Sequence, residues 1–288
     1  MASNILHFLK AGKGRHTNDV LNKIREDVIP KLYSPPSEYL EDKEYGQVWK
    51  DLSQKWNTVL KTLCPVEYDN VNVKKLAGRG NHKDHEITFM YRDEPVYKLN
   101  TEFKHNCSKL DNLPQYYNAP EKKRFIKQSY AEYFYDKWID LICELSEKLV
   151  KPDKKSYLKY IYTSDDSKHS FFQTLRIEES KIEKEKKKIV QLSIKEYLDK
   201  YVTDLNLEIL SEDLKTSQKE KTFILWNCKE FFTDTIRAEE LELSEIVEIK
   251  NNNTIVVKSK AGTEHHMLLR WKNHLGILYP AWQISLKR

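Results

Sequence analysis

Hydrophobic and polar residues alternate in two neighbouring segments, residues 86–91 and 96–104, as they do in half-buried strands. The residues between them, 92–95 (RDEP), are typical of a turn, because proline suits a turn or a strand entry better than a strand interior. The pattern therefore predicts an antiparallel β-hairpin. On its second strand Glu102 and Lys104 share one face, and the opposite face is apolar.

Helices and strands elsewhere follow from the same kind of pattern. Apolar residues that recur every three or four positions predict helices, and short apolar or aromatic runs between turn residues predict strands. The expected helices run from Thr17 or Asn18 to Pro30 and over residues 48–63, 121–150 and 178–201. The expected strands cover residues 66–76, 156–162, 223–226, 244–249, 254–258, 267–271 and 277–285, with a hairpin turn at residues 251–253.

The order of these elements predicts the fold class. Mixed helices and strands in the first two thirds indicate an α/β domain with a mixed central β-sheet flanked by helices, and the short strands after residue 222 indicate a smaller β-rich C-terminal module. A chain of 288 residues is long enough for two such domains. We expect the boundary near residue 205, with a first domain over residues 1–205 and the module over residues 206–288.

Composition and charge narrow the class of protein. With 39% hydrophobic and 32% charged residues the chain is expected to be globular and strongly hydrated, and the net charge of +5 is compatible with a polyanionic partner. The four cysteines form no C-x-x-C pair, so we expect neither a structural zinc site nor a disulfide framework. We expect no membrane span and no signal peptide, and hence a cytoplasmic protein, or a nuclear one in a eukaryotic or viral setting, that is not secreted.

The hairpin carries the residue types needed for metal-assisted phosphodiester hydrolysis. Asp84 and Glu86 lie on the face of the first strand that matches Glu102 and Lys104 on the second. Neighbouring carboxylates bind a hard divalent cation such as Mg²⁺, which polarises a phosphodiester and makes a bound water acidic enough to attack it. A lysine beside them adds fixed positive charge near the developing oxyanion. Asp84, Glu86 and Glu102 are therefore the candidate metal ligands.

An upstream acid followed by Glu102-Phe103-Lys104 resembles the signature of the restriction-endonuclease-like, PD-(D/E)XK, nuclease superfamily, which is an acid, a strand and Glu-x-Lys. Asp84 has the usual residue type of the first acid, so we favour it, whereas Glu86 directly precedes the apolar strand where that acid often lies. Gln115 resembles the glutamine that some members carry on the helix that follows. The resemblance covers residues 83–115 of the 288.

The resemblance implies a function and a role for each residue. It implies Mg²⁺-dependent hydrolysis of double-stranded DNA, and within the superfamily the compact chain favours a site-specific endonuclease of the type II restriction kind. Asp84 or Glu86 would hold the metal together with Glu102, Lys104 would position and activate water, and Gln115 would orient Lys104 or the scissile phosphate. A homodimer is compatible with the sequence.

Two other functions stay open at this point. One is an exonuclease or repair nuclease of the same superfamily. The other is a non-catalytic nucleic-acid-binding protein, because lysine and glutamate also alternate on solvated strand faces. Some members of the superfamily take a further acid from an N-terminal helix, and the sequence does not distinguish Glu26, Glu38 and Glu44 for that role.

Candidate DNA contacts lie in two further segments. Arginine, lysine and asparagine are the side chains that read guanine and adenine edges, and tryptophan can stack on an unpaired base. A glycine-bearing loop precedes the hairpin, and a basic, aromatic segment at residues 270–274 is expected to be a loop between two strands. Neighbouring His265 and His266 have no other metal ligand at a matching spacing. The candidate DNA contacts are Arg79, Asn81, Arg270, Lys272 and Asn273.

Overall fold

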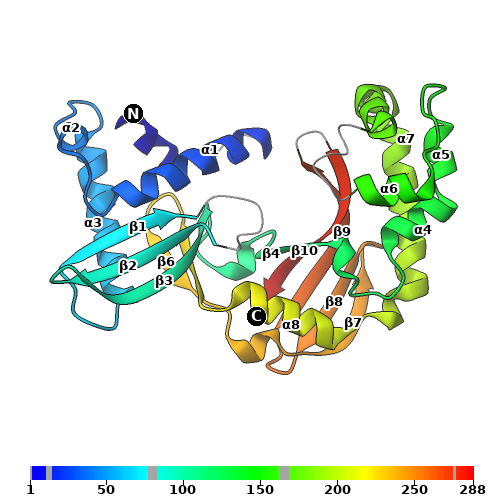
Figure 1. Ribbon diagram of the computed structural model, residues 1–288. Coiled ribbons are helices and arrows are strands. Elements are labelled where there is room, and N and C mark those ends of the chain that lie inside the picture. The colour runs from blue at the N-terminus through cyan, green and yellow to red at the C-terminus, as the bar shows by residue number, and fades with distance from the viewer. Residues whose placement is uncertain (1, 11–14, 77–82, 162–168, 275–276) are drawn as a thin grey trace. The chain divides into compact units, whose positions relative to one another are not determined.

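The computed structural model describes residues 2–10, 15–76, 83–161, 169–274 and 277–288 (Figure 1). The chain divides into two compact units, each made of two segments. Unit 1 comprises Met1–Asn112 and Thr216–Arg237, and unit 2 comprises Leu113–Lys215 and Ala238–Arg288. This division differs from the boundary expected near residue 205, because the segment 216–237 returns to the first unit.

Unit 1 contains a mixed five-stranded sheet in the order β1-β2-β3-β5-β6. Strands β3 and β5 are parallel and the other neighbours are antiparallel, so the expected α/β fold with a mixed sheet is confirmed. The strands are β1 (Asn70–Lys75), β2 (His85–Tyr91), β3 (Glu94–His105), β5 (Lys221–Trp226) and β6 (Phe231–Asp234).

The expected hairpin is confirmed as β2 and β3. Arg92 and Asp93 form its two-residue turn with φ values of 51° and 65°, the left-handed conformation that tight hairpins require at both positions. The Arg92 backbone N–H also donates to Asp69 Oδ2 at 2.8 Å, which fixes the turn against the entry to β1. In the register His85 pairs with Thr101 and Glu86 with Asn100, so the segment just before β2 lies beside Glu102.

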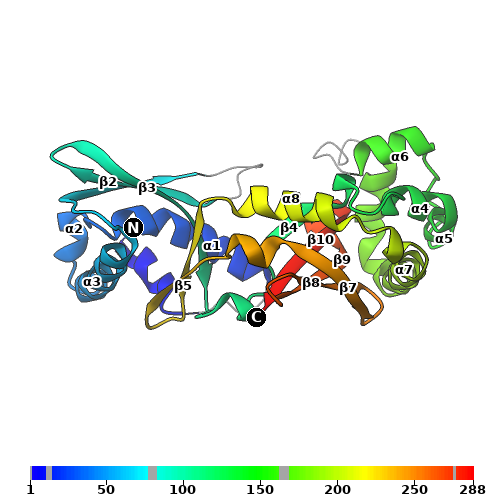
Figure 2. The same cartoon turned by 90° about the horizontal axis from the view of Figure 1, so that it is seen from below.

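Helices cover one face of this sheet, as Figure 2 shows for α1, α2 and α3 against β2 and β3. Odd-numbered apolar residues of the hairpin, such as Phe89 and Phe103, pack in the same core as Trp49 and Trp56 of α3. The even-numbered residues therefore lie on the other face. The helical segments of unit 1 are η1 (Ala2–Phe8), α1 (Arg15–Val28), η2 (Ile29–Lys31), α2 (Ser37–Leu40), α3 (Gly46–Leu63) and η3 (Leu110–Asn112).

Unit 2 contains a five-stranded antiparallel sheet in the order β4-β10-β9-β8-β7 and its own helices. The strands are β4 (Tyr117–Pro120), β7 (Leu243–Lys250), β8 (Thr254–Ser259), β9 (Glu264–His274) and β10 (Ile277–Lys287). The helices are η4 (Glu121–Lys123), α4 (Tyr130–Lys137), α5 (Ile139–Cys143), α6 (Lys154–Tyr160), α7 (Ser170–Tyr201), η6 (Val202–Asp204), η7 (Ala238–Leu241) and α8 (Leu207–Gln218), whose last residues enter unit 1.

Two of the three longest periodic segments were predicted correctly. The helix expected over residues 48–63 is α3, and the helix expected over residues 178–201 is the C-terminal part of α7. The strands expected after residue 222 are β5 and β7 to β10, and Asn251 and Asn252 adopt positive φ in the turn between β7 and β8. In the described part of the chain, no helix is both long enough and apolar enough to cross a membrane.

Two expected elements in unit 2 are wrong. The single helix expected over residues 121–150 is interrupted, because Ser129 caps the start of α4 by accepting a hydrogen bond from the Glu132 N–H. The strand expected over residues 156–162 is instead α6. Asp153 caps this helix by accepting from the Ser156 N–H at 2.9 Å. Tyr157, one of the aromatic residues that suggested a strand, is fully buried and stacks on Phe172 of α7, and Tyr162 lies outside the described residues.

His265 of β9 is fully buried in unit 2, with hydrogen-bond partners at both ring nitrogens. Its Nδ1 lies 2.8 Å from the Tyr116 hydroxyl, and its Nε2 lies 2.6 Å from the backbone carbonyl of Glu240. Burial lowers the pKa of His265 to about 4, although the Glu240 carbonyl opposes this shift. The imidazole is thus a neutral core group, and neither nitrogen is available to a metal ion.

We therefore expect an acid-sensitive contribution of His265 to stability. The unfolded chain binds a proton at this residue below a pKa of roughly 6.5, whereas the folded chain resists it down to about 4, so stability is complete at neutral pH and falls as the pH falls through that window. Within this window the free energy of unfolding should fall by about 1.4 kcal/mol for each pH unit. The free energy of unfolding, measured with urea between pH 7 and 4, should fall less steeply with falling pH in His265→Gln than in the parent.

His266→Gln is the matched control, since it removes a neighbouring half-buried imidazole and keeps His265. An equal dependence of unfolding free energy on pH in the parent and in His265→Gln would contradict the prediction.

Candidate active site

Glu102 of β3 lies between two lysines in unit 1. Its Oε1 forms an ion pair with Nζ of Lys104, which leaves the same face of β3 two residues further on. Its Oε2 accepts a hydrogen bond from Nζ of Lys221 at 2.6 Å. Lys221 is the first residue of β5, which runs parallel to β3 and places this lysine beside Asn100. Both oxygens of one carboxylate therefore carry an ammonium partner.

Asp84 lies at the start of the hairpin and is fixed by backbone hydrogen bonds. Its N–H donates to the carbonyl of Thr101, and its own carbonyl accepts from the Leu76 N–H, both at 2.8 Å. Its carboxylate Oδ2 accepts from the Phe103 N–H, also at 2.8 Å. The side chain therefore crosses from β2 to β3 at the residue between Glu102 and Lys104.

The two acids have opposite pKa shifts. Burial raises the pKa of Asp84, the negative charge of Glu102 raises it further, and Lys104 opposes both effects. Burial also works against ionisation of Glu102, but Lys104 and Lys221 outweigh burial and lower the pKa of Glu102. Glu102 is therefore firmly ionised, and Asp84 is the acid whose charge a nearby cation would stabilise most.

The two lysines also have opposite pKa shifts. Burial works against the charge of Lys104, but Glu102 and then Asp84 outweigh it and raise the pKa of Lys104. For Lys221 burial is the stronger effect and lowers its pKa, although Glu102 opposes the shift. Lys104 thus keeps its positive charge between two carboxylates.

A third acid approaches from α1. Burial raises the pKa of Glu26, and the negative charge of Asp84 raises it further, while Lys75 opposes both from 3.4 Å. The Glu26 carbonyl also lies 3.0 Å from Nε2 of His85, which ties α1 to the residue after Asp84. Of the three N-terminal acids left open by the sequence, Glu26 is the one found beside Asp84.

The two remaining hairpin candidates lie elsewhere. Glu86 pairs in register with Asn100 of β3 and Lys74 of β1, one step along the strand from Asp84. Gln115 belongs to unit 2, and its expected helical context is wrong, because it lies in an irregular segment just before β4. The chain after η3 enters the second sheet instead of a helix, so a role for Gln115 at Glu102 stays a prediction.

The donor atoms suit a hard divalent cation. Among the described residues no group of three or more His, Cys, Asp or Glu is already placed to hold a metal ion. However, Asp84, Glu102 and Glu26 all offer carboxylate oxygens as ligands. By like-charge repulsion, Glu102 raises the pKa of Asp84, and Asp84 raises the pKa of Glu26. A cation such as Mg²⁺ would relieve that repulsion. Because each oxygen of Glu102 has an ammonium partner, a cation that binds Glu102 competes with Lys104 or Lys221.

The candidate DNA contacts fall into two groups. Arg79 and Asn81 lie outside the described residues. Arg270, Lys272 and Asn273 lie in unit 2, on β9 and not in a loop, so the expected loop between two strands is wrong. The cause is that β9 and β10 are both longer than their apolar runs, because the ladder continues through the polar residues.

Two side chains of this segment have partners within unit 2. Arg270 donates from Nη1 to Gln283 Oε1 at 3.1 Å. The Trp271 ring lies 4.9 Å from the Phe134 ring, and its Nε1 donates to the Tyr130 hydroxyl at 3.0 Å. Trp271 therefore packs between the sheet and α4, which is the core role that aromatic residues in such segments usually have.

Sequence reasoning missed Lys221. The strand was expected from residue 223 and was placed in the C-terminal module, far from Glu102. One signal was present: the lysine stands directly before the apolar run TFILW, and a strand buried on both faces carries a lysine only if it has a partner.

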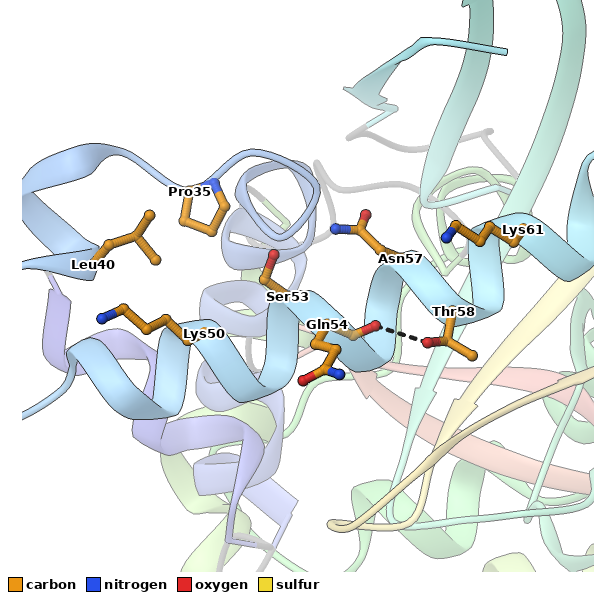
Figure 3. Close-up of a pocket in the computed structure, with 8 residues that line it drawn as sticks. All are labelled: Pro35, Leu40, Lys50, Ser53, Gln54, Asn57, Thr58 and Lys61. Atoms are coloured by element: carbon orange, nitrogen blue, oxygen red, sulfur yellow. Dashed lines mark hydrogen bonds between the residues drawn. The ribbon is translucent and has the colours of Figure 1, made fainter. Parts of the chain in front are cut away.

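A separate hollow lies on the outer side of α3 (Figure 3). Its volume is about 500 Å³, and six of its eight lining residues are polar. It contains none of Asp84, Glu102, Lys104 and Lys221, which together form the carboxylate–lysine cluster, so it is distinct from that cluster. The lining residues are Pro35, Leu40, Lys50, Ser53, Gln54, Asn57, Thr58 and Lys61.

Comparison of the chain with protein-family models, with curated proteins and with solved structures found no match. The candidate active site is therefore assigned from its residues and their geometry. It consists of Asp84, Glu102, Lys104 and Lys221, with Glu26 beside Asp84.

Proposed function

We propose that the protein is a Mg²⁺-dependent deoxyribonuclease that cuts DNA internally, with its catalytic residues in unit 1. One observation carries the proposal: Asp84 is hydrogen-bonded to the backbone between Glu102 and Lys104, so two carboxylates and a lysine meet at one end of the hairpin. This is the constellation that the resemblance to restriction-endonuclease-like nucleases requires. The net charge of +5 is compatible with a DNA substrate.

Each residue has a distinct role in this proposal. Asp84 and Glu102 would hold Mg²⁺, which when bound polarises the phosphodiester and makes a water molecule more acidic. Glu102 is suited to this because its lowered pKa keeps it ionised. Lys104, whose raised pKa keeps it positive, would lie beside the scissile phosphate and stabilise the charge that develops there. Glu26 supplies a further carboxylate at Asp84.

The finer parts of the proposal concern the substrate. Site-specific cleavage of the type II restriction kind would require contacts to base edges. Arg270, Lys272 and Asn273 on β9 are the candidates within the described residues, and unit 2 would then serve in substrate binding.

A second function is supported by a different observation. Both oxygens of Glu102 already have lysine partners, and one of those lysines is almost fully buried. An ion-pair network of this kind also occurs as a purely structural feature of protein cores. A non-catalytic nucleic-acid-binding protein is the alternative that this observation favours.

A plasmid assay tests the proposed function. We expect the purified chain to convert closed circular DNA into nicked and linear forms in the presence of Mg²⁺, because an endonuclease needs no free end. Excess EDTA should stop the reaction, and Mg²⁺ added beyond the chelator should restore it.

The same assay distinguishes the other functions. An exonuclease would leave the closed circle intact and degrade only the linear form. A non-catalytic binder would leave both intact while it retards them in a gel. Intact circles at all Mg²⁺ concentrations would contradict the endonuclease proposal.

A further inference from the structure

The two lysines that bind Glu102 differ in their freedom to move. The Lys221 side chain is 1% exposed, whereas that of Lys104 is 23% exposed. Lys221 Nζ also lies over the ring of Phe223 at 5.1 Å from its centroid, and Phe223 is itself fully buried. The Lys221 side chain is therefore buried, and that of Lys104 borders solvent.

Their alternatives on losing Glu102 differ as well. Asp84 raises the pKa of both lysines, so the difference lies in solvent access: Lys104 borders solvent and can release Glu102 while water and Asp84 still stabilise its charge. A buried ammonium that loses a hydrogen-bonded carboxylate without gaining water costs several kcal/mol. Lys221 therefore remains on Glu102 when another cation approaches, and Lys104 is the partner that gives way.

We propose that Lys221 is a positioning residue that holds Glu102 by Oε2, and that a divalent cation takes Oε1 by displacing Lys104. This inference rests on the proposed nuclease function and assigns different tasks to two lysines on one carboxylate. Lys104, once released, moves toward Asp84 and the scissile phosphate. Lys221 keeps the carboxylate in place and does not touch the substrate.

The two lysine variants are expected to change metal affinity in opposite directions. Lys221→Met removes the support of Oε2, so Mg²⁺ should bind at least about tenfold more weakly, as is usual when a residue that orients a metal ligand is lost. Lys104→Met removes the ammonium that competes for Oε1, so Mg²⁺ should bind more tightly, while plasmid cleavage is lost. Isothermal titration calorimetry of the full chain without DNA measures both affinities.

Two further variants control the comparison. Lys98→Met removes an exposed lysine of the same strand, β3, and should leave Mg²⁺ affinity unchanged. Lys221→Arg keeps a cationic donor for Oε2 and should bind Mg²⁺ more tightly than Lys221→Met does.

The inference is overturned if Lys221→Met binds Mg²⁺ as tightly as the parent, or if Lys104→Met binds it more weakly. Weaker Mg²⁺ binding by Lys104→Met overturns the inference by itself, even if Lys221→Met does not fold. Failure of the nuclease proposal would appear instead as uncut plasmid with the parent chain.

Discussion

Glu102→Gln is expected to lower Mg²⁺-dependent plasmid cleavage by at least about a hundredfold, because even residues that only orient a metal ligand change affinity or activity by about 10–100-fold. Glutamine keeps the shape of the side chain and removes the charge that would hold the cation. DNA binding in EDTA should persist, since a negative charge that faces phosphates has gone. Cleavage rates and gel retardation measure the two effects separately.

The variant also leaves Lys221 without its carboxylate. Breaking a buried pair on one side destabilises a protein by about 3–5 kcal/mol, so thermal unfolding must accompany the assay. The double variant Glu102→Gln/Lys221→Met should recover much of the lost stability and none of the cleavage, which separates chemistry from folding. Parent-like cleavage by folded Glu102→Gln would remove the hairpin from consideration as the active site.

Asp84→Asn and Glu86→Gln are expected to differ sharply. The Asp84 carboxylate accepts a hydrogen bond from the Phe103 N–H and lies in the field of Glu102. Glu86, two residues further on, pairs with Lys74 and Asn100 instead. We therefore expect cleavage to fall by at least about a hundredfold in Asp84→Asn and to change little in Glu86→Gln. The two variants make the same change of charge two residues apart, just before β2 and within it, so each controls the other.

Initial rates of plasmid cleavage over a range of Mg²⁺ concentrations measure this difference. Asp84→Asn should also need more Mg²⁺ for half-maximal activity, because a candidate ligand has lost its charge. The opposite pattern, an inactive Glu86→Gln and an active Asp84→Asn, would move the metal site along the strand.

The hairpin was predictable because its cause is local. Alternation of polar and apolar residues fixes which face each side chain takes, so Glu102 and Lys104 were placed together from the sequence alone. The position of Asp84 beside that end of β3 depends on more than the turn, because a register shift between Phe89 and Met90 brings His85 opposite Thr101.

Lys221 and Glu26 were not predictable in the same way. Lys221 reaches Glu102 only because β5 joins β3 in parallel after the whole first segment of unit 2, and no local pattern encodes such a pairing. Glu26 was one of three equivalent acids until the packing of α1 against His85 distinguished it. The failed helix and strand in residues 121–162 have a related cause, since caps and aromatic packing overrode the period of the sequence.

The parallel pairing of β3 with β5 also bears on how the chain folds. The first three strands of unit 1 are synthesised before unit 2 begins, whereas the strand that carries Lys221 follows residue 215. Bringing β5 to β3 closes a very long loop, and the entropic cost is lower once the intervening segment has become compact. Long-range parallel pairing is intrinsically slow. We therefore expect the pairing that brings Lys221 to Glu102 to form late in folding, after β1, β2 and β3 have paired with one another.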